Sequence, residues 1–104
     1  MNGWDLGALL AMAATAVFWL DSLRARERAV TAGRAACARN GLQFLDETVA
    51  FARLRLGRDE AGRLRLERVY VFEFSDTGNN RRDGSIVVLG AQVRDLHMEP
   101  FLLQ

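Results

Sequence analysis

The side chains that most often carry catalysis or bind metals are scarce in this chain of 104 residues. It contains one histidine, His97, and one cysteine, Cys37. A zinc site needs three or four ligands, usually Cys or His, so this pair cannot form one. A nucleophilic site would join His97 to Ser75 or Ser85, but neither serine lies in a recognisable nucleophile turn. We therefore predict a protein that is not an enzyme, with no catalytic, cofactor-binding or metal-binding residues.

Two segments that contain carboxylates also lack the features of a catalytic or metal-binding site. Asp46 and Glu47 are adjacent, and adjacent side chains of a strand point to opposite faces, so they could share a proton only at a bulge. The segment DTGNNRRDG, residues 76–84, is rich in oxygen atoms but lacks the ligand order and the distal Glu of a calcium loop. Its Arg81 and Arg82 would repel a cation. We interpret it as a solvated hairpin loop.

The elements that would position these residues begin with an apolar segment. Residues 6–20 contain no charge and no proline, and at ~1.5 Å per residue they form about 22 Å of helix. The hydrocarbon core of a bilayer is ~30 Å thick, a length reached only by extending the helix from Trp4 to Leu23, past Asp5 and Asp21. Trp4 and Trp19 occupy the positions of the two aromatic belts at the membrane interfaces. We predict a transmembrane anchor over residues 1–22.

The charges that flank this segment predict its orientation. Residues 21–40 carry five arginines against two acids, whereas no basic residue precedes the apolar segment. A cleaved signal peptide carries its positive charge before the apolar core, so the segment is predicted to be retained. The positive-inside rule places the N-terminus outside and the remaining residues in the cytoplasm. The lone Cys37 agrees with a reducing compartment.

Residues 23–41 are predicted to form a basic, amphipathic juxtamembrane helix that ends at Asn40 and Gly41. Its apolar line is Leu23, Val30, Gly33 and Cys37, and a strip of alanines lies beside it. Whether the span and this helix form one rod or bend at residues 21–22 is left open.

The arginines that follow the span have three interpretations. Arg24, Arg26 and Arg28 can act as a topology signal and contact anionic lipid, each worth ~1 kcal/mol near the surface. A nucleic-acid site is disfavoured, because no aromatic residues are interleaved and no binding motif is present. The third interpretation is a docking surface for an acidic partner. Among these arginines, Arg26 alone falls outside the polar side of the predicted helix.

After Gly41 the pattern changes to strands. We predict strands over residues 42–56 and 63–74, with a turn at 58–62 and a bulge near Ala52 and Arg53. Residues 85–98 form a third strand that Gly90 breaks or bends, and Pro100 ends it. The predicted fold class is α+β: the helix, then an antiparallel meander of three or four strands over residues 42–104, covered by Leu23, Val30 and Cys37.

The second predicted strand has two different faces. One carries leucines and aromatic residues and is interrupted by Arg68. The other is predicted to be exposed and to bind a protein partner through Val69 and Val71, with Arg81 and Arg82 of the following loop. We thus expect a non-enzymatic accessory or adaptor protein, with arginine-mediated binding of anionic lipid or nucleic acid as the alternative. Homodimerisation stays open, because small residues recur at helical spacing in the span, at Gly3, Gly7, Ala11 and Ala14.

Three segments carry a family resemblance over essentially the whole chain: FWLDSLRARERA, ACARNGLQFLDETVAFARLRL and RVYVFEFSDTGNNRRDGSIVVLG. With the closing MEP, they resemble small proteobacterial membrane proteins grouped as domain of unknown function 3301. The resemblance implies one N-terminal span and a short domain on the cytoplasmic side. It implies no activity, because none is established for that family.

Overall fold

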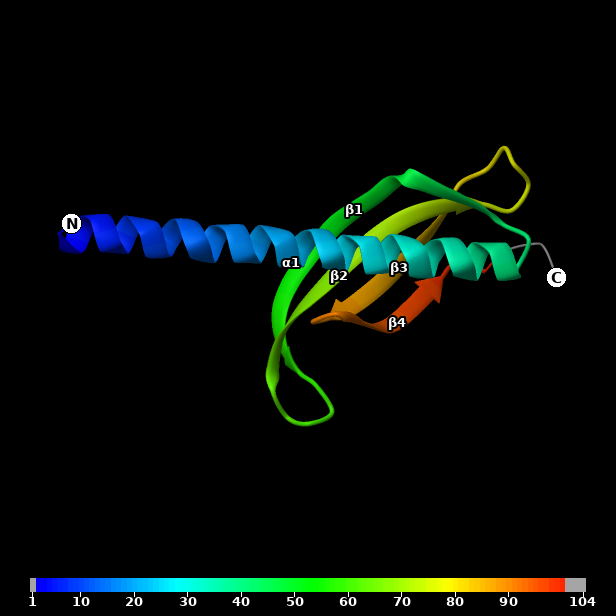
Figure 1. Ribbon diagram of the computed structural model, residues 1–104. Coiled ribbons are helices and arrows are strands. Elements are labelled where there is room, and N and C mark those ends of the chain that lie inside the picture. The colour runs from blue at the N-terminus through cyan, green and yellow to red at the C-terminus, as the bar shows by residue number, and fades with distance from the viewer. Residues whose placement is uncertain (1, 101–104) are drawn as a thin grey trace.

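The computed structural model describes residues 2–100 and shows one long helix followed by a four-stranded sheet (Figure 1). The elements in chain order are α1 (Gly3–Arg39), β1 (Gln43–Arg58), β2 (Leu64–Ser75), β3 (Arg82–Leu89) and β4 (Gln92–Met98). Neighbouring strands are antiparallel and the sheet order is β1-β2-β3-β4. This confirms the predicted α+β fold with an antiparallel meander. The N-terminal half of α1 protrudes beyond the sheet, so the molecule is elongated, with extents of 63 × 30 × 17 Å (Figure 1).

Helix α1 is continuous through residues 21–22, so the predicted span and juxtamembrane helix form one rod of 37 residues. At its start the Asn2 side chain accepts from the Asp5 N–H at 3.0 Å, and the Asp5 carboxylate accepts from the Asn2 N–H at 3.3 Å. This capping box satisfies two backbone donors that have no partner within the helix. At the other end Gly41 has φ +69°, the left-handed conformation that glycine adopts without strain. The helix therefore ends where the sequence predicts.

The C-terminal half of α1 lies across one face of the sheet through small side chains. Its buried residues are Ala25, Ala29, Gly33, Ala36 and Cys37. A Cβ at Gly33 would lie 2.7 Å from the ring of Phe44, so glycine is needed for the close approach of helix and sheet. The expectation that Leu23 covers the sheet is wrong, since Leu23 is 52% exposed. A large side chain between helix and sheet would hold the helix away from the aromatic residues of the sheet. The alanine strip of α1, and not Leu23, therefore faces the sheet.

The core between helix and sheet is aromatic and aliphatic. Its fully buried members on β2 and β3 include Tyr70, Phe72, Phe74, Ile86 and Val88. The ring centroid of Phe72 lies 5.4 Å from that of Phe44 and 6.1 Å from that of Phe74. Gly84, opposite Phe72 on β3, leaves the space that this ring fills, because any Cβ there would overlap it. The β2 face predicted to be apolar is thus the face that α1 covers.

Strand β1 is irregular at two places. The pairing with β2 shifts between Phe51 and Arg53, which confirms the predicted bulge, and also between Leu45 and Ala50, which the sequence did not predict. At the second irregularity the hydroxyl of Thr48 accepts from the Glu73 N–H at 2.7 Å and so satisfies a β2 donor. With these bends the β1–β2 hairpin curves away from the rest of the sheet (Figure 1).

The last predicted strand is two strands in the structure. Strands β3 and β4 are joined by a turn in which Gly90 has φ +61°, which explains why the pattern breaks at this glycine. Strand β4 ends at Met98, two residues before Pro100. The hairpin loop predicted over residues 76–84 is shorter in the structure, because β3 already begins at Arg82.

Candidate functional site

A buried arginine joins the sheet to the helix where the apolar segment ends. Arg68 on β2 is 1% exposed. Its Nη2 lies 3.1 Å from Oδ2 of Asp21 and donates to Oγ of Ser22, also at 3.1 Å. The guanidinium carbon lies 5.3 Å from the centroid of the Phe18 ring, a cation–π contact. The residue that interrupts the apolar pattern of β2 is therefore the residue that binds the helix.

Burying a guanidinium is costly unless it is paired with an anion and hydrogen-bonded. The Asp21 side chain is 45% exposed and the Arg68 side chain is 1% exposed, so solvent reaches the ion pair from the side of Asp21. Arg68 neutralises Asp21 one residue after the uncharged segment. Beside it, burial raises the pKa of Tyr70 above its ordinary value of 10.0. Residues 21 and 22 thus hold the sheet in place instead of forming a bend.

The three arginines predicted to contact lipid differ in their environments. Arg26 donates from Nη2 to the Val49 carbonyl at 3.3 Å, within the irregularity of β1 between Leu45 and Ala50, which explains its position outside the polar side of the helix. Arg24 and Arg28 are exposed. They lie four residues apart and therefore share one side of α1. All three residues are exposed, and Arg26 differs from Arg24 and Arg28 in its hydrogen bond to the sheet.

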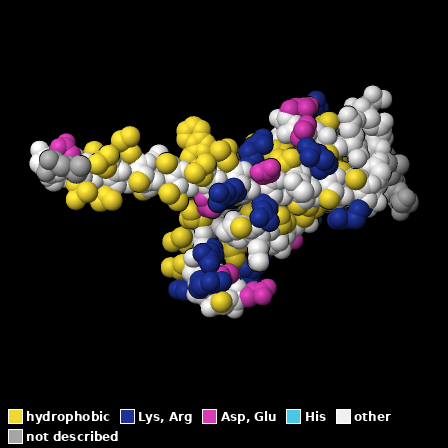
Figure 2. Space-filling view, in the orientation of Figure 1, with side chains coloured by type: hydrophobic (Ala, Val, Ile, Leu, Met, Phe, Trp, Pro, Cys, Tyr) yellow, Lys and Arg dark blue, Asp and Glu magenta, His cyan; other side chains and the backbone are white. Residues whose placement is uncertain are grey.

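The N-terminal half of α1 is apolar and exposed. By length and composition α1 is long and apolar enough to cross a membrane, and the apolar stretch that meets this condition contains no buried residue. Figure 2 shows hydrophobic side chains along this protruding part. Trp4 and Trp19, predicted to lie at the two interfaces, are 85% and 64% exposed.

The residues predicted to contact a partner are only partly accessible. Val71 is 41% exposed, but the prediction that Val69 is exposed is wrong, since Val69 is 8% exposed. Its register partners Arg53 and Val87 flank it on both sides, because β2 is an inner strand.

The two arginines of the loop after β2 have partners within the chain. Arg81 donates to Glu73 at 2.9 Å, and Nε of Arg82 lies 3.6 Å from Oδ2 of the buried Asp76. Neither arginine is thus an isolated charge that only a partner could neutralise. The Arg81 side chain is still 60% exposed, whereas that of Arg82 is 33% exposed.

The oxygen-rich loop uses its oxygen atoms internally. Oδ1 of Asn80 accepts from the Ser75 hydroxyl at 3.0 Å and from the backbone N–H groups of Asp76 and Thr77 at 3.2 and 3.3 Å. Within residues 2–100 no group of three or more His, Cys, Asp or Glu is arranged to hold a metal ion. We therefore describe this loop as a self-contained turn centred on Asn80.

The two side chains with reactive potential lie apart from each other. Cys37 is 1% exposed on α1, and its burial raises the pKa of the thiol above 9.0. His97 is exposed on edge strand β4, opposite Ser85 in the register of the sheet. The thiol is thus inaccessible and held in its unreactive protonated form, while the imidazole faces solvent.

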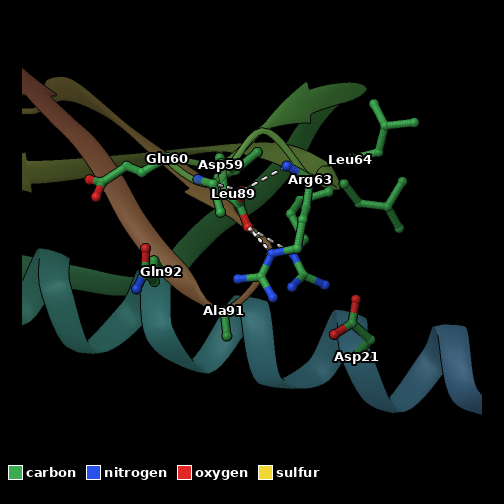
Figure 3. Close-up of a pocket in the computed structure, with 12 residues that line it drawn as sticks. Asp21, Asp59, Glu60, Arg63, Leu64, Leu89, Ala91 and Gln92 are labelled. Atoms are coloured by element: carbon green, nitrogen blue, oxygen red, sulfur yellow. Dashed lines mark hydrogen bonds and ion pairs between the residues drawn. The ribbon is translucent and has the colours of Figure 1, made fainter.

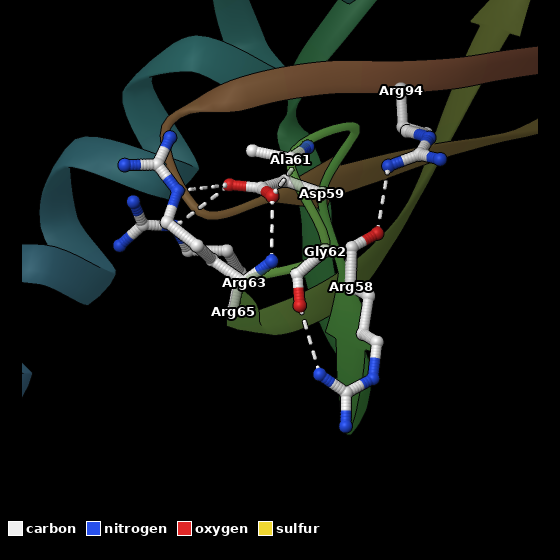
Figure 4. Close-up of polar contacts among 7 residues, drawn as sticks. All are labelled: Arg58, Asp59, Ala61, Gly62, Arg63, Arg65 and Arg94. Atoms are coloured by element: carbon white, nitrogen blue, oxygen red, sulfur yellow. Dashed lines mark hydrogen bonds and ion pairs between the residues drawn. The ribbon is translucent and has the colours of Figure 1, made fainter.

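A cleft of about 740 Å³ lies between the β1–β2 turn, the β3–β4 turn and α1 (Figure 3). Asp59, which lines it with Asp21 and Glu60, accepts from the N–H groups of Ala61 and Arg63, and from Nε of Arg63 and Arg65 at 3.1 and 3.3 Å (Figure 4). The Arg63 backbone N–H, with the two guanidinium groups, lowers the pKa of Asp59 below 3.8. Asp59 is therefore ionised, and its hydrogen bonds stabilise the turn. An ionised carboxylate has no proton to donate, so Asp59 is not suited to act as an acid.

These features define a class of protein: an α+β chain built on one long helix, apolar and exposed in its N-terminal half and covered by a four-stranded antiparallel sheet in its C-terminal half. The family model described as Protein of unknown function (DUF3301) matches residues 5–100, nearly the whole chain. The chain belongs to this family, which confirms the resemblance found in its sequence. No curated protein and no solved structure matches it.

Proposed function

We propose that this chain is a single-pass membrane protein with a non-enzymatic accessory role, whose sheet binds a protein partner at the cytoplasmic face of a bacterial inner membrane. One observation carries the proposal: the same helix is exposed and apolar in its N-terminal half and packed against a sheet in its C-terminal half. The core helix of a soluble domain would be buried where it is most apolar. Insertion of that half into a bilayer removes its side chains from water.

The charges of α1 support the orientation. Arg24 and Arg28 are exposed just beyond the apolar segment, and the residues that precede this segment include no arginine. Positive charge of this kind is retained on the cytoplasmic side. The paired Arg68 and Asp21 fix the sheet to α1 at this level. The domain is thereby held close to the membrane surface and in one orientation, as suits an adaptor.

The proposed partner surface is the sheet face that α1 leaves uncovered. Its centre is Val71, flanked along β2 by the buried Val69 and by the Glu73–Arg81 ion pair. Non-obligate protein interfaces are about as apolar as the rest of a protein surface and have a polar rim, so a small apolar patch beside balanced charges is compatible with one. This surface has no predicted catalytic residue. Its proposed role is therefore to bind.

The test uses two matched substitutions in the full chain. Val71→Asp introduces a charge on the proposed surface, and Val93→Asp introduces the same charge at a site of similar exposure, 39% against 41%, on edge strand β4. Affinity isolation in mild detergent should recover a defined partner with the unchanged chain and with Val93→Asp, and lose it with Val71→Asp. Equal recovery with both variants, or recovery of chaperones alone, would contradict the proposal.

A second function, binding of anionic phospholipid, is supported by the exposed pair Arg24 and Arg28. Replacing both with Gln should reduce the number of anionic lipids retained by the purified chain in native mass spectrometry. Replacing Arg34 and Arg39, which lie farther along α1, should leave that number unchanged. Equal retention by the two double variants would rule out a specific role for Arg24 and Arg28.

A further inference from the structure

The β1–β2 hairpin presents leucines on the same side as the apolar half of α1. Pairing in this hairpin places Leu54 opposite Arg68 and Leu56 opposite Leu66, so these side chains share the face of the sheet that binds the helix. Beyond the edge of α1, none of the described residues 2–100 covers this face. The exposed fractions are 55% for Phe51, 42% for Leu54, 70% for Leu56 and 57% for Leu64.

The level of the hairpin along α1 follows from three contacts. At one end of the sheet the ring of Phe44 packs against Gly33. Farther along, Arg68 binds Asp21. Beyond Arg68, Leu66 lines a groove of about 680 Å³ with apolar residues of the protruding half, among them Ala13, Ala14, Val17, Phe18 and Leu20. The hairpin therefore extends toward the N-terminal half of α1 and overlaps the last turns of its apolar segment.

A second groove, on the β1 side of α1, agrees with this placement. It has a volume of about 540 Å³ and brings Phe51 and Leu54 of β1 together with Phe18, Trp19 and Leu23 of α1. Trp19 is one of the two tryptophans predicted to lie at a membrane interface, the other being Trp4. The exposed side chains of the hairpin thus lie at the level of the interfacial tryptophan.

Most charged side chains of the hairpin lie on the opposite face, whereas the buried Arg68, and Arg58, which is opposite Leu64 near the turn, share the face of the leucines. Arg53, Arg55 and Arg65 alternate with the leucines along β1 and β2, and Arg55 pairs with Glu67 at 2.7 Å. Figure 2 shows hydrophobic side chains on the edge of the hairpin that faces the protruding helix, with arginines behind them. An element that lies in a membrane interface has this arrangement: apolar side chains enter the border of the acyl chains, and arginines remain with the head groups.

We propose that the β1–β2 hairpin is a second membrane contact, whose Phe51, Leu54, Leu56 and Leu64 enter the interface of the bilayer that α1 spans. The inference rests on the proposed anchoring of α1 and is independent of the partner. It also accounts for the short apolar segment. Residues 6–20 form about 22 Å of helix against a hydrocarbon core of ~30 Å, and the hairpin adds apolar surface beside the C-terminal end of this segment.

The experiment measures the depth of single sites in the full chain, in nanodiscs of phosphatidylethanolamine and phosphatidylglycerol. In a Cys37→Ala background, a nitroxide label is attached at Leu56→Cys, Leu64→Cys, Leu10→Cys or Thr77→Cys, one site at a time. Relaxation by oxygen, which concentrates in lipid, is compared with relaxation by a water-soluble nickel complex. Leu10 lies in the apolar segment, and Thr77 is exposed in the loop between β2 and β3.

We expect the ratio of oxygen to nickel accessibility at Leu56 and Leu64 to exceed the ratio at Thr77 severalfold and to approach the ratio at Leu10. A ratio equal to that at Thr77, with a high ratio at Leu10, would overturn the hairpin contact and leave the anchoring intact. Low accessibility to both reagents would show that protein covers the leucines, and would also overturn it. Water access at Leu10 would overturn the anchoring itself, and with it this inference.

Discussion

Nη2 of Arg68 on β2 lies 3.1 Å from Oδ2 of Asp21 on α1, and this ion pair fixes the sheet to the helix at the end of the apolar segment. The same guanidinium contacts Ser22 and the ring of Phe18. Because Arg68 is buried in the face that α1 covers, its charge has to be balanced from the helix. The position of the sheet along the helix is thus tied to one buried charge.

The first prediction concerns this pair. Asp21→Asn should destabilise the sheet by about 1–3 kcal/mol, less than the ~3–5 kcal/mol of a fully buried pair because Asp21 is 45% exposed. Arg68→Met should cost less, since it leaves no buried charge. The double variant should be more stable than Asp21→Asn alone. Hydrogen exchange of the β2 and β3 amides in detergent micelles measures these values, and strict additivity of the two changes would contradict a coupled pair.

The second prediction concerns the close approach of helix and sheet at Gly33. Gly33→Leu should destabilise the domain by about 1–3 kcal/mol, the usual cost of overpacking. Even the Cβ atom alone would lie 2.7 Å from the Phe44 ring. The control Ala35→Leu, at an exposed position two residues farther on, should change stability little. Denaturant unfolding in micelles compares them. Equal stability of the two variants would show that the helix does not require a glycine at this contact.

The third prediction concerns the loop centred on Asn80. Asn80→Ala removes the acceptor used by Ser75, Asp76 and Thr77, and should cost about 1–2 kcal/mol, less than ~1 kcal/mol for each of three separate hydrogen bonds because the three donors share one oxygen atom. Trypsin should then cleave after Arg81 faster than in the unchanged chain. Asn79→Ala, in the same loop, serves as the control and should be cleaved at the original rate. Identical rates for the two variants would refute the role of Asn80.

The fourth prediction concerns the thiol of Cys37, whose pKa burial raises above its ordinary value of 9.0. In the folded protein a thiol reagent at about pH 8 should label it slowly, because the reactive species is the thiolate. Labelling should accelerate when denaturant unfolds the sheet. Rapid labelling of the folded chain would contradict the burial.

The same thiol makes stability depend on pH. The folded state binds the proton more tightly than the unfolded state, so this contribution is fully present below about pH 9 and is lost as the pH rises through the raised pKa. The Cys37→Ala variant should lack this part of the decline. Parallel pH profiles of the two proteins above pH 9 would argue against the shift.

Much of the architecture could be predicted from local patterns. The apolar segment, the stop at Asn40 and Gly41, the break at Gly90 and the bulge near Ala52 each depend on residues that are neighbours in the sequence. Periodicity and turn chemistry act over a few residues, so they are readable before the chain is folded. The same patterns placed the aromatic residues of β2 on one face.

The assignment of individual side chains to a site needed the tertiary structure. In the sequence Arg68 interrupts an apolar face and Arg26 falls outside a polar one; their partners, Ser22 and the Val49 carbonyl, lie 46 and 23 residues away. The burial of Val69 and the exposure of Leu23 likewise depend on which elements pack beside them.

The sequence by itself determined the order of helix and strands, the apolar segment with its arginine-rich flank, and the family. Only the tertiary structure decided which side of α1 supports the sheet, how Asp21 is neutralised, and that the leucines of the β1–β2 hairpin lie beside the apolar half of the helix. The physical reason is the distance along the chain over which each interaction acts. Backbone conformation follows from adjacent residues, whereas burial and charge pairing are set by elements that meet only after the chain has folded.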